Sequence, residues 1–194
     1  PDADHIGGLI EVLKSLSVKE VWLSGQENTT VTFEDYVDAI ARSGATVRKA
    51  RRGDRFNLGS IVVDVLHPID PFFSGRNNNS VVLKLKFGDI SFLFAGDAEK
   101  EAESSMIAAR LPLESTILKL GHHGSRTSTS APFLAAVKPQ VAVYQAGVRN
   151  QFGHPHPETI KALNAAGIRI LGTDVHGAIV ISTDGKTYTV KTER

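Results

Sequence analysis

The sequence predicts a single α/β domain, built as a layered sandwich in which helices cover sheets. Two observations predict this class. Apolar residues recur at helical spacing in some segments, and alternate or run without interruption in others. Runs such as SIVVDVL and QVAVYQ are apolar on both faces, which indicates strands covered on both sides. We expect roughly ten strands and five helices, with no linker that divides the chain.

The first fifty residues predict two helices around one strand. Helical spacing spans 8–17, a buried strand covers 18–24, and a second helix covers 33–44. Thr32 is the expected N-cap of that second helix, with Asp35 as its capping-box partner and Gly44 as a left-handed C-cap.

The remaining elements form a strand meander followed by alternating helices and strands. Meander strands are expected over 45–50, 53–60, 61–68, 81–88 and 89–97, with an Asn-rich loop after the third. Helices over 99–111, 131–137 and 156–166 then alternate with strands over 116–121, 140–146 and 168–173. A hairpin over 178–190 turns at Asp184 and Gly185.

Composition limits the chemistry that the chain can carry. In its 194 residues, 22 Lys and Arg nearly balance 21 Asp and Glu, so nucleic-acid binding requires a local basic patch. The absence of cysteine excludes disulfides, thiolate metal ligands and cysteine nucleophiles. No apolar run approaches the roughly 18 residues of a membrane span, so we expect a soluble domain.

Five of the seven histidines fall in three short polar motifs. The motifs are Asp2-x-Asp4-His5, Gly121–Ser125 and His154-Pro155-His156, and a fourth motif, FAGD, ends a strand at Asp97. Loops at strand ends are where a rigid scaffold presents functional groups. Imidazole nitrogens and carboxylate oxygens suit divalent ions, and a pair of ions needs a bridging carboxylate. The pattern therefore predicts a metal centre formed by Asp2, Asp4, His5, Asp97 and one or more of His122, His123 and His154.

The segment PDADHIGG resembles the metallo-β-lactamase superfamily motif His-x-His-x-Asp-His-x-Gly-Gly, with Asp2 in place of its second His. The set DADHIGG, NNNSVVL, FLFAGD, LKLGHHGS and GHPHP is more specific. It is similar to the metallo-β-lactamase-like domain of ComEC-type competence proteins and their free-standing relatives, over essentially the whole chain. The resemblance implies an αββα sandwich whose opening strands precede the motif, so we expect one domain over 1–194 that lacks its N-terminal strands.

By motif order, the resemblance implies two divalent ions bridged by Asp97, with Asp4 and His5 on the second ion. The expected ligand set is Asp2, Asp4, His5, Asp97, His122 and His154, and catalytic roles are expected for Asp4, His122 and His123. Asn77–Asn79 stand where a middle His belongs, and Asp2 stands in a His position. Oxygen ligands favour Mn²⁺, with Zn²⁺ and Mg²⁺ as alternatives.

Local geometry refines the assignments of the two histidine pairs. We expect one of His122 and His123 to face the site and the other to hydrogen-bond outward. His154 and His156 flank a proline and should point in opposite directions, with His154 as the ligand. His67, at a predicted strand end, is expected to be an exposed or strand-terminal histidine.

Substrate contacts are expected at Asn79, Ser80, Ser125, Arg126 and His156. The hydroxyl-rich segment 125–133 suits phosphate oxygens, and equally suits a turn followed by a helix cap. A basic run, consisting of Arg48, Lys49, Arg51, Arg52 and Arg55 on one predicted hairpin, is either a DNA contact or a solvated edge strand.

The resemblance implies a metal-dependent nuclease with DNA as its partner. It also implies either an extracytoplasmic domain joined to the membrane part of a larger inner-membrane protein or a free-standing relative. Two alternatives remain open: hydrolysis of a small ester, lactam or thioester on the same fold, and a binding module without catalysis. A basic open groove would favour DNA, and a closed apolar pocket would favour a small molecule.

Overall fold

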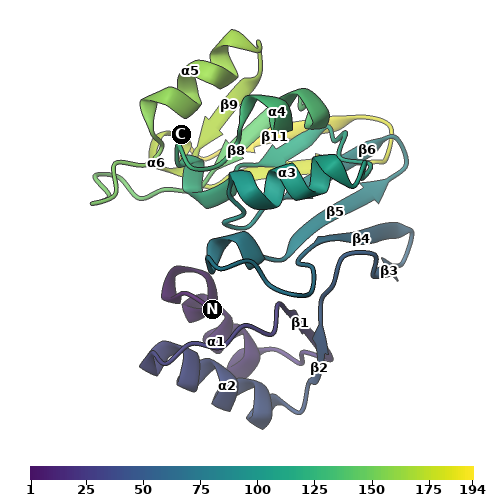
Figure 1. Ribbon diagram of the computed structural model, residues 1–194, viewed down its shortest axis with the longest axis vertical. Coiled ribbons are helices and arrows are strands. Elements are labelled where there is room, and N and C mark those ends of the chain that lie inside the picture. The colour runs from purple at the N-terminus through teal and green to yellow at the C-terminus, as the bar shows by residue number, and fades with distance from the viewer. The chain divides into compact units, whose positions relative to one another are not determined.

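The structure, a computed structural model, describes residues 1–194. It contains two compact units, Pro1–Ala50 and Arg51–Arg194, which are coloured purple to blue and blue to yellow in Figure 1. The units meet in the chain directly after a strand, with no intervening linker. No helix combines the length and the apolar content that crossing a bilayer requires.

The first unit packs two helices beside a two-stranded parallel sheet. Its elements are α1 (Ala3–Ser15), β1 (Glu20–Leu23), α2 (Val31–Ser43) and β2 (Thr46–Lys49). Its core consists of Ile6, Leu13, Tyr36, Ala39 and Ile40. The strand that the sequence assigned to the start of the meander is therefore β2, the parallel partner of β1.

Both helices of the first unit begin earlier than predicted. Helix α1 starts at Ala3, so Asp2 is its N-cap residue and Asp4 lies in its first turn. A carboxylate at this end of a helix interacts favourably with the helix dipole. Helix α2 is capped by Thr30, whose side chain accepts from the Phe33 N–H at 3.3 Å. The predicted cap, Thr32, lies inside the helix.

The second unit is built on a seven-stranded mixed sheet in the order β3-β4-β5-β6-β7-β8-β9. The predicted meander is confirmed for β3 to β6, which pair antiparallel, whereas β6 to β9 pair parallel. The strands are β3 (Arg55–Leu58), β4 (Ile61–His67), β5 (Val82–Phe87), β6 (Ile90–Phe94), β7 (Ile117–Lys119), β8 (Val141–Tyr144) and β9 (Arg169–Gly172).

Helices and a hairpin cover the two faces of this sheet (Figure 1). The covering elements are α3 (Lys100–Ala108), α4 (Ala131–Val137), α5 (Pro157–Ala165), α6 (Thr173–His176) and the antiparallel pair β10 (Ile179–Thr183) and β11 (Tyr188–Thr192). Two short 3-10 turns, η1 (Asn77–Asn79) and η2 (Gly121–Gly124), complete the unit.

Strand alternation explains why both faces are apolar. Leu93 of β6 enters the main core with Met106 of α3 and Phe133 of α4. Its neighbour Phe92 enters the second core, which Ile181 of β10 helps to cover. Because successive strand residues point to opposite faces, continuous apolar runs mark strands that are buried on both sides. The α/β sandwich predicted from these runs is confirmed.

Candidate metal centre

The polar motifs of the second unit follow three neighbouring parallel strands. Asp97 comes after β6, His122 and His123 come after β7, and the loop that leaves β8 leads to His154. Because parallel strands end at the same edge of a sheet, their carboxyl-terminal loops gather there, and ligands of open α/β sheets bind at such edges. The topology thus brings together residues far apart in the sequence.

The Asp97 carboxylate is buried and its backbone is held in place. The residue is 8% exposed, and its N–H donates to Ser80 Oγ at 3.1 Å. A side chain at Gly96, where φ is 54°, would press on Ser80. Ser80, expected to contact substrate, therefore holds the turn that carries Asp97.

His122 and His123 both adopt left-handed backbone conformations, with φ of 45° and 55°. Their ring centroids lie 5.4 and 6.1 Å from that of His154. Both rings thus lie near that of His154, contrary to the expectation that one of them would turn outward, because two successive left-handed residues direct both side chains to one side. The flanking glycines permit close approach, since a Cβ would lie 2.8 Å from the Ala98 carbonyl oxygen at Gly121 and 2.8 Å from Pro155 at Gly124.

The rings of His122 and His123 are both hydrogen-bonded through Nδ1. His123 Nδ1 lies 2.9 Å from the carbonyl oxygen of Gln145, to which it donates. His122 Nδ1 lies 3.0 Å from Glu99 Oε1. In each neutral ring, Nε2 then carries the lone pair, which is the arrangement that metal-binding histidines usually have. His123 Nε2 is buried 3.7 Å from Asp97 Oδ1.

Glu99 is a member of this site that sequence reasoning missed. Besides His122, its Oε1 accepts from Thr127 Oγ1 at 2.8 Å and from Asn77 Nδ2 at 3.3 Å. The available signal was its place two residues after Asp97, in FAGDAE, but the residue was assigned only to the start of a helix.

His154 and His156 lie on the same side of the chain, with ring centroids 4.9 Å apart. The prediction that they point in opposite directions is wrong, because the chain here is an irregular loop and not a strand. The Arg126 N–H donates to His156 Nδ1 at 3.1 Å, so the neutral His156 ring carries its proton on Nε2. Burial lowers the pKa of His154, and the rings of His122, His156 and His123 lower it further.

The Asn-rich turn η1 is a structural element. Asn79 is 1% exposed, and its amide bonds the backbone of Phe73 and Gly75, which leaves no surface for the predicted substrate contact. Asn78 Oδ1 accepts from the N–H groups of Glu99 and Ala102 and so caps α3. Because the amide oxygens of Asn78 and Asn79 both accept from backbone N–H groups, these two amides do not act as the oxygen ligands that would favour Mn²⁺.

His67 lies at the end of β4 and is fully buried, so the prediction of a strand-terminal position is confirmed and that of exposure is wrong. Its Nε2 lies 2.6 Å from the carbonyl oxygen of Asn78, and Arg52 approaches its Nδ1 at 3.4 Å. Burial is the main reason that its pKa falls to about 4. The neutral ring therefore anchors η1.

The hydroxyl-rich segment 125–133 forms a turn followed by a helix cap, which is the second of the two structures that its sequence suits. Ser125 is 3% exposed and its Oγ is hydrogen-bonded to Thr127. The prediction that Ser125 contacts substrate is therefore wrong. Ser130 caps α4, and its N–H donates to the buried carboxylate of Glu103. Arg126 is exposed and remains available to a ligand.

The basic run does not form one hairpin. Arg48 belongs to β2 of the first unit and pairs with Glu20. In the second unit, Arg51 pairs with Asp70 and Arg55 pairs with Asp64, both at 2.5 Å, while Arg52 bonds the Leu66 carbonyl oxygen and Ser105. Internal partners thus engage the four arginines, and the run is not a free basic patch.

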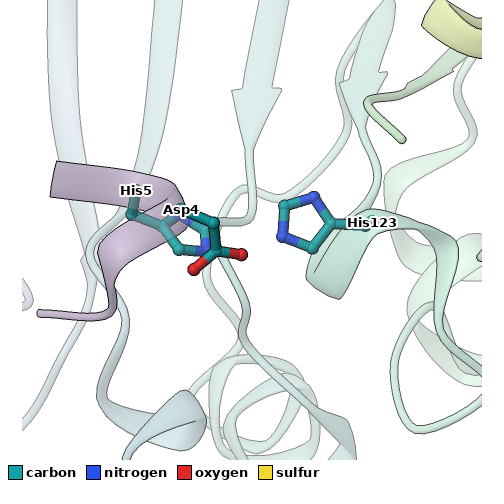
Figure 2. Close-up of side chains that lie close together, drawn as sticks. All are labelled: Asp4, His5 and His123. Atoms are coloured by element: carbon teal, nitrogen blue, oxygen red, sulfur yellow. The ribbon is translucent and has the colours of Figure 1, made fainter. Parts of the chain in front are cut away.

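The motif of the first unit lies at the start of α1. Figure 2 shows Asp4 and His5 on the purple first turn of that helix, and it shows the ring of His123 within the second unit. His5 Nε2 and Asp4 Oδ2 are 3.8 Å apart, and both residues are exposed. Asp2 accepts from Asn28 Nδ2 at 3.3 Å.

The donor set of the second unit fits a divalent ion. Carboxylate oxygens and imidazole nitrogens are donors that suit a divalent cation, and a hydrogen bond at Nδ1 orients an imidazole for ligation through Nε2. Asp97, His122 and His123 supply such groups, and His154 lies beside them with a lowered pKa.

The chain belongs to the metallo-beta-lactamase superfamily, whose family profile matches residues 1–148. Among curated proteins, it is 33% identical over 178 residues to "ComE operon protein 3" of Bacillus subtilis, covering 92% of this chain and 23% of that protein. It is 35% identical over 126 residues to "Competence protein ComA" of Neisseria gonorrhoeae, covering 64% and 18%, respectively. "Recombination protein 2" of Haemophilus influenzae is 28% identical over 181 residues, covering 93% and 21%.

These relatives are much longer than the chain, which spans 18% to 23% of their length. Among solved structures, CmlA, a diiron beta-hydroxylase from Streptomyces venezuelae, superposes with a TM-score of 0.51 at 13% identity. The superposition covers 78% of this chain and 38% of CmlA. At this identity the likeness shows the fold alone. Membership of the superfamily suggests divalent metals and a metal-dependent hydrolase.

Proposed function

We propose that this chain is a metal-dependent phosphodiesterase that cleaves DNA, of the ComEC type, acting during DNA uptake. The observation that carries the proposal is the oriented pair His122 and His123, whose Nδ1 atoms are hydrogen-bonded beside the buried carboxylate of Asp97. The names of the competence and recombination relatives support DNA as the partner. The resemblance of the motifs to ComEC-type proteins implies a parent protein with a membrane part and an extracytoplasmic location for this domain, or a free-standing relative.

The superfamily motif order supports a ligand set of Asp2, Asp4, His5, Asp97, His122 and His154. Two divalent ions held by these groups would supply a water of lowered pKa and neutralise charge on a phosphate. Mn²⁺ remains our preference over Zn²⁺ and Mg²⁺, now on the carboxylate of Asp2 alone.

The chain's own side chains supply positioning and proton transfer. Because Nδ1 of each ring donates to a fixed acceptor, Nε2 of His122 or His123 would first take up a proton, and the resulting imidazolium would then pass that proton to the leaving 3′ oxygen. We assign this step to His123 if His122 is a ligand. We retain Asp4 in a catalytic role from the motif. The exposed guanidinium of Arg126 and the Nε2–H of His156 are free to donate to non-bridging phosphate oxygens.

Variants at Asp97 and His5 test the proposal. Asp97→Ala and His5→Ala should each abolish metal-dependent cleavage, because each removes a proposed ligand, while the far-UV circular dichroism spectrum stays unchanged. The measurement is cleavage of labelled single- and double-stranded DNA in Mn²⁺, Mg²⁺, Zn²⁺ or EDTA. Asp38→Ala, at an exposed position of α2, is the matched control and should cleave normally.

Wild-type-like cleavage by either variant would overturn the metal centre that we assign to the nuclease, and absence of cleavage by the wild type would overturn the nuclease assignment itself. Turnover of a small ester without any cleavage of DNA would support the small-molecule hydrolase instead. Purified protein that neither binds metal nor cleaves DNA would support a binding module.

A further inference from the structure

The loop from Gly147 to Gly153 presents an aromatic ring beside the proposed metal centre. Phe152 is 65% exposed, and its ring stacks on that of His154 with centroids 5.9 Å apart and planes 25° apart. Single exposed apolar residues are common on protein surfaces. The position of this one is informative because its ring contacts a histidine of the cluster.

Asn150 holds the loop against His154. Its Oδ1 accepts from the His154 N–H at 2.9 Å, and its Nδ2 donates to the His154 carbonyl oxygen at 2.6 Å and to that of Gly147 at 3.0 Å. Arg149 projects from the same turn and is exposed. The loop therefore holds an aromatic ring beside the cluster and carries an exposed guanidinium on the same turn.

We propose that Phe152 is a stacking platform for an unpaired nucleobase next to the scissile phosphate, with Arg149 contacting the strand's backbone. This inference rests on the proposed nuclease function and names its substrate class as single-stranded DNA or a frayed end. In a duplex, each base is covered by its neighbours, so only an unstacked base can cover the phenyl ring. Stacking on one aromatic residue changes affinity by about tenfold to a hundredfold.

Exposed Val148, Arg149 and Phe152 would also suit a membrane surface. The contact with His154 favours the nucleobase, because it ties Phe152 to the proposed reaction site and not to a separate apolar face.

The test combines variants of the loop with base-deleted substrates. Phe152→Ala should raise KM for a single-stranded oligonucleotide about tenfold or more, with little change in kcat, whereas Phe152→Tyr should retain activity. A series of oligonucleotides, each with one abasic site, should contain one position where loss of the base raises the KM of the wild type as much as Phe152→Ala does. At that position, loss of the base should leave the KM of Phe152→Ala unchanged. Val148→Ala, which removes an equally exposed side chain of the same loop, is the control and should leave KM unchanged.

A flat abasic scan together with normal KM in Phe152→Ala would overturn the stacking platform and leave the nuclease assignment standing. If the wild type cleaves no DNA, the nuclease assignment fails, and oligonucleotide binding by fluorescence anisotropy then decides the inference. Equal affinities of wild type and Phe152→Ala would overturn it. Phe152-dependent sedimentation with anionic vesicles, without an effect on oligonucleotide binding, would assign the loop to a membrane.

Discussion

Three histidines near the proposed metal centre differ in whether Nδ1 donates or accepts a hydrogen bond. In His122 and His123 this nitrogen donates, to a carboxylate and to a backbone carbonyl respectively, whereas in His156 it accepts from a backbone N–H. The first two rings therefore present a lone pair on Nε2, and the third presents a proton. The direction of this one hydrogen bond thus distinguishes His122 and His123, as candidate ligands, from His156, as a candidate hydrogen-bond donor.

The ring of His122 depends on Glu99, which gives a prediction at the residue scale. Glu99→Gln should weaken Mn²⁺ binding by about tenfold to a hundredfold, because a neutral amide holds Nδ1–H less firmly than a carboxylate. Calorimetric titration measures the affinity, and ¹⁵N NMR of the side chain reports which ring nitrogen carries the proton. Glu101→Gln, on the same helix and bonded to Asn78, is the control.

Unchanged affinity in Glu99→Gln, or the same loss in Glu101→Gln, would contradict this role. Failure of the wild type to bind Mn²⁺ would instead count against the proposed metal centre, while the NMR spectrum would still test the tautomer.

At the scale of elements, buried polar contacts connect β4, η1 and α3. His67 at the end of β4 binds the Asn78 carbonyl oxygen, and the Asn78 side chain caps the helix that carries Glu103. Glu103 is 1% exposed and accepts from the N–H groups of Thr129 and Ser130. The burial that raises the pKa of Glu103 is offset in part by these bonds. The network therefore holds in place the loop segments that contain Glu99, Thr129 and Ser130, next to the metal centre.

His67 makes stability depend on pH. Its pKa is about 4 in the folded state, against an ordinary value of 6.5. Between these two pH values His67 is protonated in the unfolded chain but neutral in the folded chain. The free energy of unfolding should therefore fall as the pH drops from 6.5 to 4, by about 3 kcal/mol in total. Urea denaturation of EDTA-treated protein measures this loss.

The comparison for this prediction is His67→Gln, which removes the titrating group and should flatten the curve between pH 6.5 and 4. The variant will be less stable at pH 7, since it loses a buried hydrogen bond, so the slope and not the absolute value is compared. Parallel curves for the two proteins would show that His67 is not responsible.

For the whole molecule, metal binding should stabilise the folded state. At a Mn²⁺ concentration one hundred times the Kd, the expected gain is about 2.7 kcal/mol. For a chain of this size, that gain corresponds to a rise in Tm of roughly 5–11 °C. Thermal melts followed by circular dichroism measure it, and Asp97→Asn should show little of the rise. An equal rise in that variant would place the ion elsewhere.

The order of the elements could be predicted because each strand and helix carries its own periodicity. The pairing of strands could not. β2 reads as the start of a meander, yet it pairs in parallel with β1, and the chain divides after it into two units. Pairing depends on which strands meet in space, and short apolar segments with similar patterns do not encode this individually.

The sequence by itself determined the chemistry of the molecule: a chain without cysteine whose histidines and carboxylates cluster in short motifs, among them Asp97 and His122. Only the tertiary structure decided which groups position these residues through hydrogen bonds. Glu99, Asn78 and His67 act through contacts between segments remote in sequence, and their role depends on burial and on the direction of single hydrogen bonds. Residue type limits which chemistry is available, whereas tautomer and position are set by neighbours that only the fold brings together.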